Sequence, residues 1–503
     1  MSSSRGLIVC LTAILLSLPF THAVSQPPLS PQSGAPIVWQ AGAPLRAARY
    51  YHTSTLLEDG RVFVTGGRNG RLPVISCELF DPSENNGAGQ WLRRTNLHEP
   101  RERHTATMFP TGAIVVTGGL NDIPLKSCEV IDPIDDVSIL IPSMNDTRYE
   151  HTATYLGYGR ILVTGSKNYD KGMTSCEIFE PQEFTGPTPM GTGVAILSYG
   201  VWRYTGSMKV PRGRHTATLL HDDRVLVTGG VSNYSPTASC EAFDKLTHRW
   251  TQVAPMNIPR AGHTATLLPD GRVIVTGGKS SMGEVASAEI FDPTAQGGLG
   301  SWRLLRDMNV ARFNHAATYH PSGVLLVTGT WVMGQGALSS ELLTIDGNVM
   351  TNSWTQVGDM LGQRSNHTST LLHDGRVLVI GGEVYGSQDA STGCEYTNSL
   401  GPLAVDALPG VATDAFLHQN IPNPFSGGTN ISFTLSRPAS IRLFIVDMLG
   451  REVAMLADGW HGIGTYSVDW DGVAAHRMLP SGSYLIVLHT GRQAASRLMT
   501  KVQ

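Results

Sequence analysis

Arginine, histidine and glutamate recur seven times in a fixed order, and these side chains can bind a metal, transfer a proton or form ion pairs. Each histidine follows an arginine by three residues; the histidines are His52, His104, His151, His215, His263, His315 and His367. Their arginines are Arg49, Arg101, Arg148, Arg212, Arg260, Arg312 and Arg364. A glutamate follows each pair, at Glu78, Glu129, Glu177, Glu241, Glu289, Glu341 and Glu395. The chemistry of the chain depends on whether these groups form one site or one repeated contact.

The sevenfold repetition favours a structural role, because an active site needs one constellation and a repeated scaffold needs the same contact in every copy. We expect each arginine and glutamate to form a hydrogen-bonded ion pair within or between repeats, since the planar guanidinium suits a carboxylate. A ring of histidines could instead suggest a metal. Equivalent residues of neighbouring repeats would lie roughly 7 Å or more apart, whereas zinc needs donor atoms about 2 Å away. We therefore expect no metal site, no cofactor and no catalytic residue in these groups.

Specific binding should lie where the repeats differ, because variable loops on a rigid scaffold carry function. Two stretches vary: the two residues between each arginine and histidine, and the loop after the second strand of each repeat. Aromatic residues beside Asn, Asp and Arg there suit sugar stacking or protein contact. The candidate ligand-binding residues are Tyr50, Tyr51, Arg68, Arg103, Tyr149, Tyr169, Arg214, Tyr234, Phe313, Asn314, Trp331 and Tyr385. The alternative for each is a plain solvated loop.

The elements that hold these residues are short strands, and the clearest copy runs from Arg260 to Met308. Successive histidines lie roughly 47–64 residues apart, the period of a four-stranded propeller blade. Strands are predicted at residues 263–268, 272–276, 288–291 and 302–308, separated by turn residues. Gly277 and Gly278 end the second strand, because paired glycines permit positive φ. Four such strands make one blade of a propeller.

The repeated phrase resembles the kelch repeat over residues 38–400. A double glycine stands at Gly66-Gly67, Gly118-Gly119, Gly229-Gly230, Gly277-Gly278 and Gly381-Gly382, and decays at Gly165-Ser166 and Gly329-Thr330. The tryptophan of the family stands at Trp91, Trp202, Trp250, Trp302 and Trp354, with Ser138 in the second copy. A Met or Leu follows each of these positions by six residues. The resemblance implies an all-β fold built as a kelch-type β-propeller.

The two ends of the array complement each other. The last copy has three strands, through Tyr396, but no closing tryptophan strand, whereas Trp39 and Leu45 show the same six-residue offset before the first arginine. We therefore expect the N-terminal strand to complete the last blade and close a ring of seven blades, which also removes exposed sheet edges.

Composition and the N-terminus indicate an exported protein. The net charge is only −4 in 503 residues, which gives no reason to expect a nucleic-acid partner. Arg5, an apolar run over residues 7–18 and the small-residue site at residues 21–23 predict a signal peptide over residues 1–23, followed by a linker over 24–37. The run is too short to span a bilayer, and we expect no membrane span elsewhere.

Five cysteines remain after the predicted cleavage, all at the same place in their repeats. They are Cys77, Cys128, Cys176, Cys240 and Cys394, and Ala288 and Ser340 take their place in the other copies. Disulfides are possible in an exported protein. An odd number at equivalent points on different blades gives no obvious pairing, so we expect buried free thiols that act as small apolar groups.

The segment after residue 401 follows another pattern. Residues 401–413 read as a linker, and 414–503 as a small Ig-like β-sandwich with strands at 431–435, 441–447, 452–456, 465–470, 483–489 and 497–502. The motifs at 419–425, 429–433, 446–453, 470–472 and 481–484 resemble the type A C-terminal sorting domain of the type IX secretion system. The resemblance implies export across an outer membrane by that machinery. The alternative is an accessory sandwich without a sorting role.

Two functions are compatible with the sequence. The first is a secreted or outer-membrane-surface binding protein, not an enzyme, whose partner is a protein or a glycan. The second is a propeller-scaffold enzyme acting on sugars, because kelch folds also host a copper-dependent sugar oxidase and a sialic-acid epimerase. No distinctive Cys-Tyr-His set and no Ser-x-Asp-x-Gly-x-Thr-Trp box occur, and fold alone does not decide function.

Overall fold

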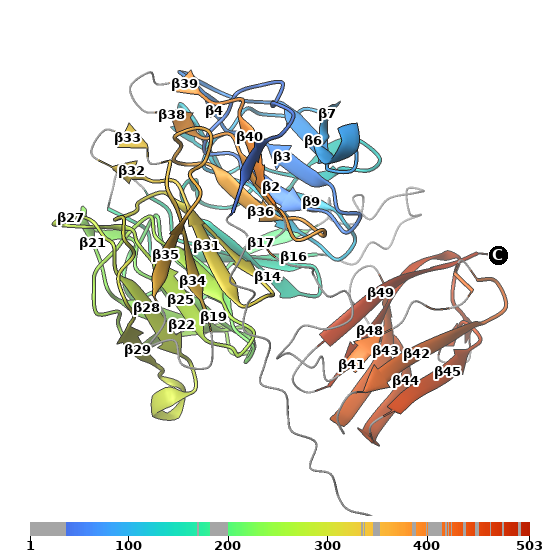
Figure 1. Cartoon of the computed structure of the whole chain (residues 1–503). Coiled ribbons are helices and arrows are strands. Elements are labelled where there is room, and N and C mark those ends of the chain that lie inside the picture. The colour runs from blue at the N-terminus through green and yellow to red at the C-terminus, as the bar shows by residue number, and fades with distance from the viewer. Residues whose placement is uncertain are drawn as a thin grey trace, which may run out of the picture. The chain divides into compact units, whose positions relative to one another are not determined.

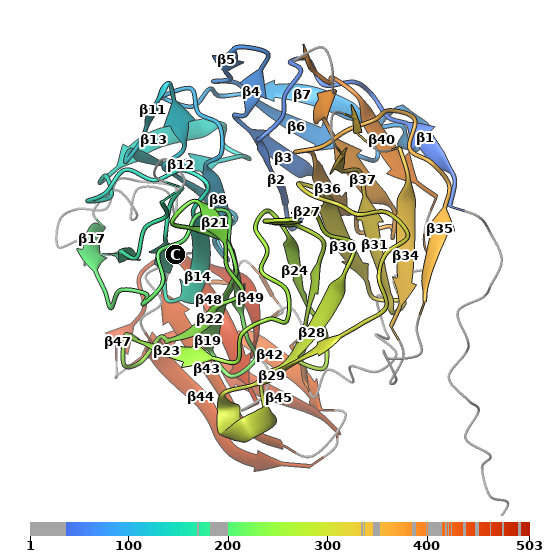
Figure 2. The same ribbon diagram turned by 90° about the vertical axis from the view of Figure 1, so that its left-hand side faces the viewer.

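The computed structural model describes residues 37–502 apart from 168–170, 182–199, 333–334, 337, 346–352, 385–388, 399, 401–414, 418–419, 421, 424, 436–438, 448–451, 463, 475–476 and 491–493. The predicted signal peptide therefore lies outside the described residues. Between Trp39 and Thr397 the chain forms repeated four-stranded antiparallel sheets of the kind typical of propeller blades (Figures 1 and 2). Helix among the described residues is limited to two 3-10 turns, Asn85–Gly87 and Ala295–Gly298.

Seven of these sheets lie in the described part of residues 37–400, each with its strands in the order first, second, third, fourth. The first three are β2 (Thr53–Leu56), β3 (Val62–Thr65), β6 (Cys77–Asp81), β7 (Gln90–Arg94); β8 (Thr105–Met108), β9 (Ile114–Thr117), β12 (Cys128–Asp132), β13 (Val137–Ile141); and β14 (Thr152–Gly157), β15 (Arg160–Thr164), β16 (Cys176–Glu180), β17 (Val201–Tyr204). The next two are β18 (Thr216–Leu219), β19 (Arg224–Thr228), β22 (Cys240–Asp244), β23 (Arg249–Val253); and β24 (Thr264–Leu267), β25 (Val273–Thr276), β28 (Ala288–Asp292), β29 (Ser301–Leu304). The last two are β30 (Ala316–His320), β31 (Val324–Thr328), β34 (Ser340–Thr344), β35 (Trp354–Val357); and β36 (Thr368–Leu371), β37 (Val377–Ile380), β40 (Cys394–Thr397), β1 (Trp39–Ala41).

The double glycines end the second strands, and the first glycine of each pair stands where a side chain would not fit. Gly277 has φ of 58° and Gly278 has φ of 101°, both in the left-handed region. A Cβ on Gly277 would lie 2.4 Å from the carbonyl oxygen of Arg312, in the next repeat. The glycine therefore sets both the turn and the close approach of the neighbouring sheet.

Among the described residues, a short hairpin follows the second strand in six repeats. These hairpins are β4 (Arg68–Asn69) with β5 (Leu72–Pro73), β10 (Leu120–Asn121) with β11 (Ile123–Pro124), β20 (Val231–Ser232) with β21 (Ser235–Pro236), β26 (Lys279–Ser280) with β27 (Gly283–Glu284), β32 (Trp331–Val332) with β33 (Gln335–Gly336), and β38 (Glu383–Val384) with β39 (Asp389–Ala390). The hairpin labels that Figure 1 prints, β4, β21, β27, β32, β33, β38 and β39, gather along one side of the ribbon. We call this side the hairpin face.

The one fourth strand whose bounds were predicted is shorter than the prediction. In the clearest copy the predicted strand over 302–308 ends at Leu304. The chain then turns, and the side chains of Leu305 and Met308 enter a core that includes Leu325 and Val327 of the next sheet. The Met or Leu six residues after each tryptophan thus fills the space between sheets, which is why the pattern continues past the strand.

The N-terminal strand completes the last sheet, as predicted. Trp39, Gln40 and Ala41 of β1 pair with Thr397, Tyr396 and Glu395 of β40 (Figure 2). The indole Nε1 of Trp39 donates to the carbonyl oxygen of Gly358 at 2.8 Å. The five repeat tryptophans make the same contact with the segment before their own sheet, with acceptors in Ala43, Pro142, Gly206, Ala254 and Arg306. These indoles tie each sheet to its neighbour.

The predicted arginine–glutamate ion pairs are confirmed in all seven repeats, and both side chains are buried in each. Each pair lies within one repeat. The carboxylate of Glu289 also accepts hydrogen bonds from the backbone N–H groups of Asn257 and Ile258, at 2.7 and 3.0 Å. The glutamate therefore holds the incoming segment as well as the arginine. The five cysteines are buried free thiols, as expected, and burial raises their pKa to about 12.

The C-terminal part, taken by itself, contains two larger sheets and one hairpin. The strands are β41 (Ala415–Leu417), β42 (Thr429–Leu435) and β45 (Gly464–Trp470) in one sheet; β44 (Glu452–His461), β43 (Ala439–Asp447), β48 (Gly482–His489) and β49 (Ala494–Lys501) in the other; and β46 (Val473–Ala474) with β47 (Arg477–Met478). Both larger sheets contribute to one apolar core. Phe425, from the predicted sorting motif at 419–425, is buried there and its ring lies 5.8 Å from that of Trp470.

Candidate functional site

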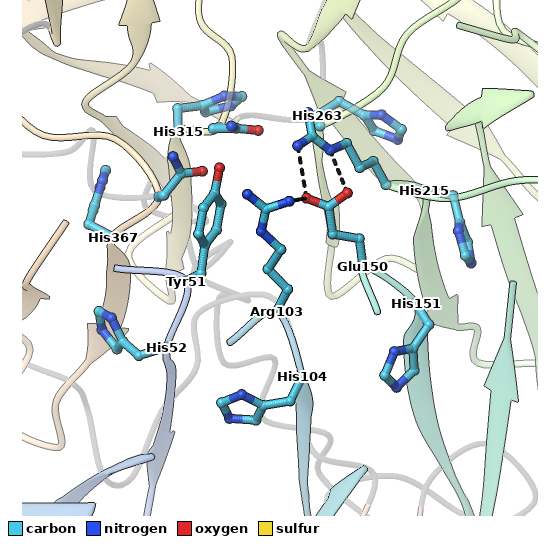
Figure 3. A pocket seen from close by; sticks show the side chains of 14 residues that line it. Tyr51, His52, Arg103, His104, Glu150, His151, His215, His263, His315 and His367 are labelled. Atoms are coloured by element: carbon cyan, nitrogen blue, oxygen red, sulfur yellow. Dashed lines mark hydrogen bonds and ion pairs between the residues drawn. The ribbon is translucent and has the colours of Figure 1, made fainter. Parts of the chain in front are cut away.

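One residue of each repeat, the one just before the histidine, lines a common pocket together with that histidine. These residues are Tyr51, Arg103, Glu150, Arg214, Gly262, Asn314 and Asn366. The cavity has a volume of about 310 Å³, and its lining residues come from all seven repeats, so we call it the axial pocket (Figure 3). Its size suits a single side chain or a small polar molecule.

The backbone places these seven residues. All of them have positive φ, from 49° at Glu150 to 61° at Gly262. Six are not glycine, and a side chain in this conformation is held there only by its surroundings. Those surroundings are a closed ring of backbone hydrogen bonds, in which each residue donates its N–H to the carbonyl oxygen of the preceding one, over 3.0–3.2 Å, and Tyr51 donates to Asn366. The pocket wall is therefore fixed independently of its side chains.

The seven histidines are structural contacts of this wall. The Nε2 atom of His104 lies 3.1 and 2.9 Å from the hydroxyl oxygens of Thr53 and Thr65, in the preceding sheet. The other histidines also contact threonine hydroxyls of the preceding sheet. Burial and then the charge of Arg101 lower the pKa of His104 to about 3. Burial lowers the pKa of the other six as well, so the ring is neutral at pH 7.

One side of the pocket carries a charged cluster that breaks the repeat pattern. Arg214 donates to both carboxylate oxygens of Glu150, at 2.7 and 2.8 Å, and Arg103 lies 2.9 Å from one of them (Figure 3). The guanidinium carbon of Arg103 also lies 4.0 Å from the centre of the Tyr51 ring, a cation–π geometry. Burial would raise the pKa of Glu150, but Arg214 and Arg103 outweigh it, and that pKa is lowered. Burial raises the pKa of Tyr51, whose phenol is therefore a neutral hydrogen-bond donor.

A second layer of charge surrounds the cluster. Arg68, on β4, donates to Glu102 at 2.8 Å, and Glu383, on β38, accepts from the amide of Asn366 at 3.0 Å. Burial raises the pKa of both carboxyl groups. Lys167 lies 4.0 Å from Glu150. The polar groups of the hairpin face are thus continuous with those of the axial pocket.

Four of the predicted binding residues line the pocket: Tyr51, Arg103, Arg214 and Asn314. Tyr50, Tyr149 and Phe313 are buried, because the first residue of each variable pair turns into the packing beside the hairpin and only the second reaches the pocket. Arg68 is half-buried against Glu102, and Trp331 is half-buried on β32. Tyr234 is exposed at the tip of its hairpin. Tyr169 and Tyr385 lie outside the described residues.

Sequence reasoning did not select three of the lining residues, Glu150, Gly262 and Asn366. The usable signal was position, because every lining residue immediately precedes a repeat histidine. A choice based on aromatic or basic character missed this shared position.

Large apolar side chains stand exposed on the hairpins around this pocket. Leu72, Ile123, Tyr234 and Met282 each lie on a different hairpin, and their exposed fractions are 71%, 67%, 64% and 97%. Because each stands on its own hairpin, the four side chains are separate apolar groups on one face. Among the described residues, no three His, Cys, Asp or Glu side chains are arranged to hold a metal ion.

Comparisons with known proteins agree with the repeat. A Kelch motif matches residues 212–257. The spermatocyte protein spe-26 of Caenorhabditis elegans is 35% identical over 95 residues, which are 18% of this chain and 16% of that protein. The chain thus spans about one sixth of the length of that curated relative.

Two solved structures are also similar. A fungal alcohol oxidase of the AA5 family, in complex with copper, has a TM-score of 0.57 and 14% identity, over 93% of this chain and 100% of that one. YjhT has a TM-score of 0.42 and 13% identity, over 71% and 96%. The chain has a kelch-type propeller scaffold. None of the described helical segments is long and apolar enough to cross a membrane.

Proposed function

We propose that the chain is an exported kelch-propeller protein that binds a protein or glycan partner on its hairpin face. One observation carries this proposal: the residues that differ between repeats form the axial pocket, and exposed apolar hairpin tips surround it on the same side of the scaffold. A rigid framework that presents variable side chains at one face is suited to recognition.

The scaffold that we propose is a closed ring of seven blades over residues 38–400. The ring of backbone hydrogen bonds through Tyr51 and Asn366 supports closure, as does the pairing of β1 with β40. The first strands of neighbouring sheets also contact one another all round, including β36 with β2. We propose that residues 414–503 form an Ig-like sandwich, supported by the single core that the two C-terminal sheets share.

Binding fits the chemistry of the pocket better than catalysis does. The buried histidines are neutral and hydrogen-bonded to threonine, so they are poorly placed to exchange protons near pH 7. Glu150 is ionised and shared by two arginines, which suits a fixed electrostatic site. The likeness to the fungal alcohol oxidase, at 14% identity, bears on fold and not on reaction.

Export is the second part of the proposal. The N-terminal pattern of residues 1–23 supports passage through the inner membrane. The order of motifs in 419–484 supports recognition by the type IX secretion machinery, and with it a place at the outer-membrane surface or outside the cell.

The binding proposal is tested by removing the apolar hairpin tips. The full chain would be screened against a glycan array and a panel of cell-surface proteins, beside a variant with Leu72, Ile123, Tyr234 and Met282 changed to Ser. A matched control changes four exposed leucines away from the hairpins, Leu246, Leu299, Leu304 and Leu361, to Ser. We expect a ligand whose binding is lost in the tip variant and kept in the control. Equal binding by both variants would show that the hairpin face is not the binding site.

A further inference from the structure

The axial pocket has an excess of positive charge in a protein whose net charge is −4. Four cationic side chains meet at it or directly behind it: Arg68, Arg103, Lys167 and Arg214. Three carboxyl groups stand among them, Glu102, Glu150 and Glu383. At the pocket itself the guanidinium groups of Arg103 and Arg214 share the carboxylate of Glu150, and Arg103 also lies 3.9 Å from the carboxylate of Glu102. A site with an excess of one sign of charge in its walls attracts ions of the opposite sign.

The contacts of Glu150 show that Arg103 and Arg214 are placed to bind a carboxylate. Arg214 uses Nε and one Nη to bind its two oxygens side by side, the planar geometry that a guanidinium makes with a carboxylate. Arg103 approaches the same carboxylate through Nη1. Its buried Nε lies 3.9 Å from Oε2 of Glu102 and makes no hydrogen bond among the described residues. The internal carboxylate thus leaves part of the guanidinium capacity of the cluster unused.

The rest of the wall adds neutral hydrogen-bonding groups. Tyr51 offers a hydroxyl that burial keeps neutral, and Asn314 and Asn366 line the pocket beside it. Gly262 contributes no side chain, and a Cβ there would lie 2.4 Å from Cε2 of the Phe313 ring. A carboxylate entering the pocket would therefore meet guanidinium, phenol and amide groups, with no second carboxylate on the lining.

We propose that the axial pocket receives the carboxylate of an acidic side chain on a partner protein, while apolar residues flanking it contact the hairpin tips. This inference rests on the proposed binding function and names the chemistry of the partner. A protein is favoured over an acidic glycan because the groups surrounding the pocket are Leu72, Ile123, Tyr234 and Met282, large apolar side chains that suit a protein surface. The pocket volume, about 310 Å³, suits one inserted side chain.

The test uses a displayed library of random 12-residue peptides, selected on the full chain at low salt. We expect the enriched peptides to share one Asp or Glu between apolar residues. The strongest would be measured by fluorescence anisotropy beside its Asn or Gln counterpart, which should bind more weakly, on the order of tenfold. D-glucuronate and D-glucose are the small-molecule probes of the glycan alternative. Each probe, and an unlabelled acidic peptide, would be tested as a competitor of the bound labelled peptide. Displacement by millimolar D-glucuronate but not by the unlabelled acidic peptide would overturn the protein assignment.

Substitutions in the cluster should change affinity in opposite directions. Glu150→Gln removes the internal negative charge and should strengthen binding of the acidic peptide, whereas Arg103→Gln should weaken it and abolish the preference over the amide counterpart. Arg103→Lys should keep the preference, and Arg303→Gln, an exposed arginine on β29, should change nothing. A merely structural role would lower binding in both Glu150→Gln and Arg103→Gln, and melting temperatures would show loss of fold.

The outcomes separate this inference from the function on which it rests. Peptides that need the hairpin tips but no acidic residue would overturn the carboxylate assignment and leave the binding face intact. Peptides unaffected by the tip variant would overturn the binding face itself. Failure of the library to enrich any acidic peptide overturns the inference.

Discussion

Arg260 and Glu289 form an ion pair from which water is excluded: Nη2 and Oε1 are 2.8 Å apart, and neither side chain is exposed. The same guanidinium donates to the carbonyl oxygens of Gly277 and Ser287, at 2.7 and 2.9 Å. The pair therefore joins the segment that enters the sheet to its second and third strands, and six other repeats contain an equivalent pair.

Removing one partner of this pair should destabilise the protein strongly. Glu289→Ala leaves a buried guanidinium without its carboxylate, and we expect a loss of roughly 3–5 kcal/mol in the free energy of unfolding. Asp270→Ala is the control, because its pair with Arg272 is partly exposed and should contribute at most about 1 kcal/mol. Urea unfolding followed by circular dichroism measures both. An unchanged free energy of unfolding for Glu289→Ala would contradict the structural role of the pair.

Deleting residues 24–45 should open the last sheet. The deletion removes β1, so β40 loses its partner strand and the indole bond from Trp39 to Gly358 is lost. An unpaired edge favours association between chains. We expect a lower melting temperature and oligomers in size-exclusion chromatography with light scattering. A truncated protein that stays monomeric and melts like the intact one would rule out closure by β1.

Acid should destabilise the protein before most carboxylates titrate. The buried histidines have folded-state pKa values well below the ordinary 6.5, about 3 for His104 and His315, so the unfolded chain binds more protons below pH 6.5. Stability is therefore full above about pH 6.5 and falls as the pH drops toward 3, by up to about 1.4 kcal/mol per pH unit for each such histidine. Urea unfolding at pH 7, 6 and 5 measures the slope, and His315→Gln should reduce it. Equal stability at pH 7 and pH 5 would refute this.

The five thiols should be unreactive in the folded protein. They are buried, and burial raises their pKa to about 12, so the reactive thiolate is nearly absent at neutral pH. We expect dithiobis-nitrobenzoate to label them only after unfolding in guanidinium chloride. Rapid labelling of the native protein would show that at least one repeat opens easily.

Removing residues 414–503 should stop export without unfolding the rest. In a host that has the type IX machinery, we expect the truncated chain to remain in the periplasm and the full chain to reach the surface or the medium. Fractionation with an antibody to the repeats measures this, and circular dichroism of the truncated protein checks its fold. Equal amounts of both chains outside the cell would leave the C-terminal sheets as an accessory domain.

Most of the scaffold could be predicted from the sequence, because the same residues recur at the same spacing in every repeat. The pair of Arg260 and Glu289 could be predicted since every copy needs the same contact, and closure by Trp39 followed from the strand missing after Tyr396. The end of the fourth strand was misplaced, because Met308 keeps the apolar spacing while it packs against the next sheet instead of pairing in its own.

The candidate site was less accessible to sequence reasoning. Which of two variable residues faces the pocket depends on a positive φ that the hydrogen-bonded ring imposes, so Tyr51 lines the pocket and Tyr50 does not. Glu150 was missed because its partners, Arg103 and Arg214, belong to other repeats and meet it only when the sheets assemble. Such a cluster depends on the order of sheets around the pocket, which no single repeat encodes.

The ring of backbone hydrogen bonds fixes the shape of the pocket wall, whichever side chains line the pocket. Tyr, Arg, Glu, Gly and Asn all occupy equivalent places in it with nearly the same φ, so the scaffold accepts an aromatic, a cation, an anion, an amide or no side chain at all. The backbone ring therefore tolerates a different side chain at each place, although Arg103, Glu150 and Arg214 also bind one another. Lineages that inherit this framework can change what they recognise through single substitutions, and a library randomised at these seven codons samples new specificities while the fold stays constant.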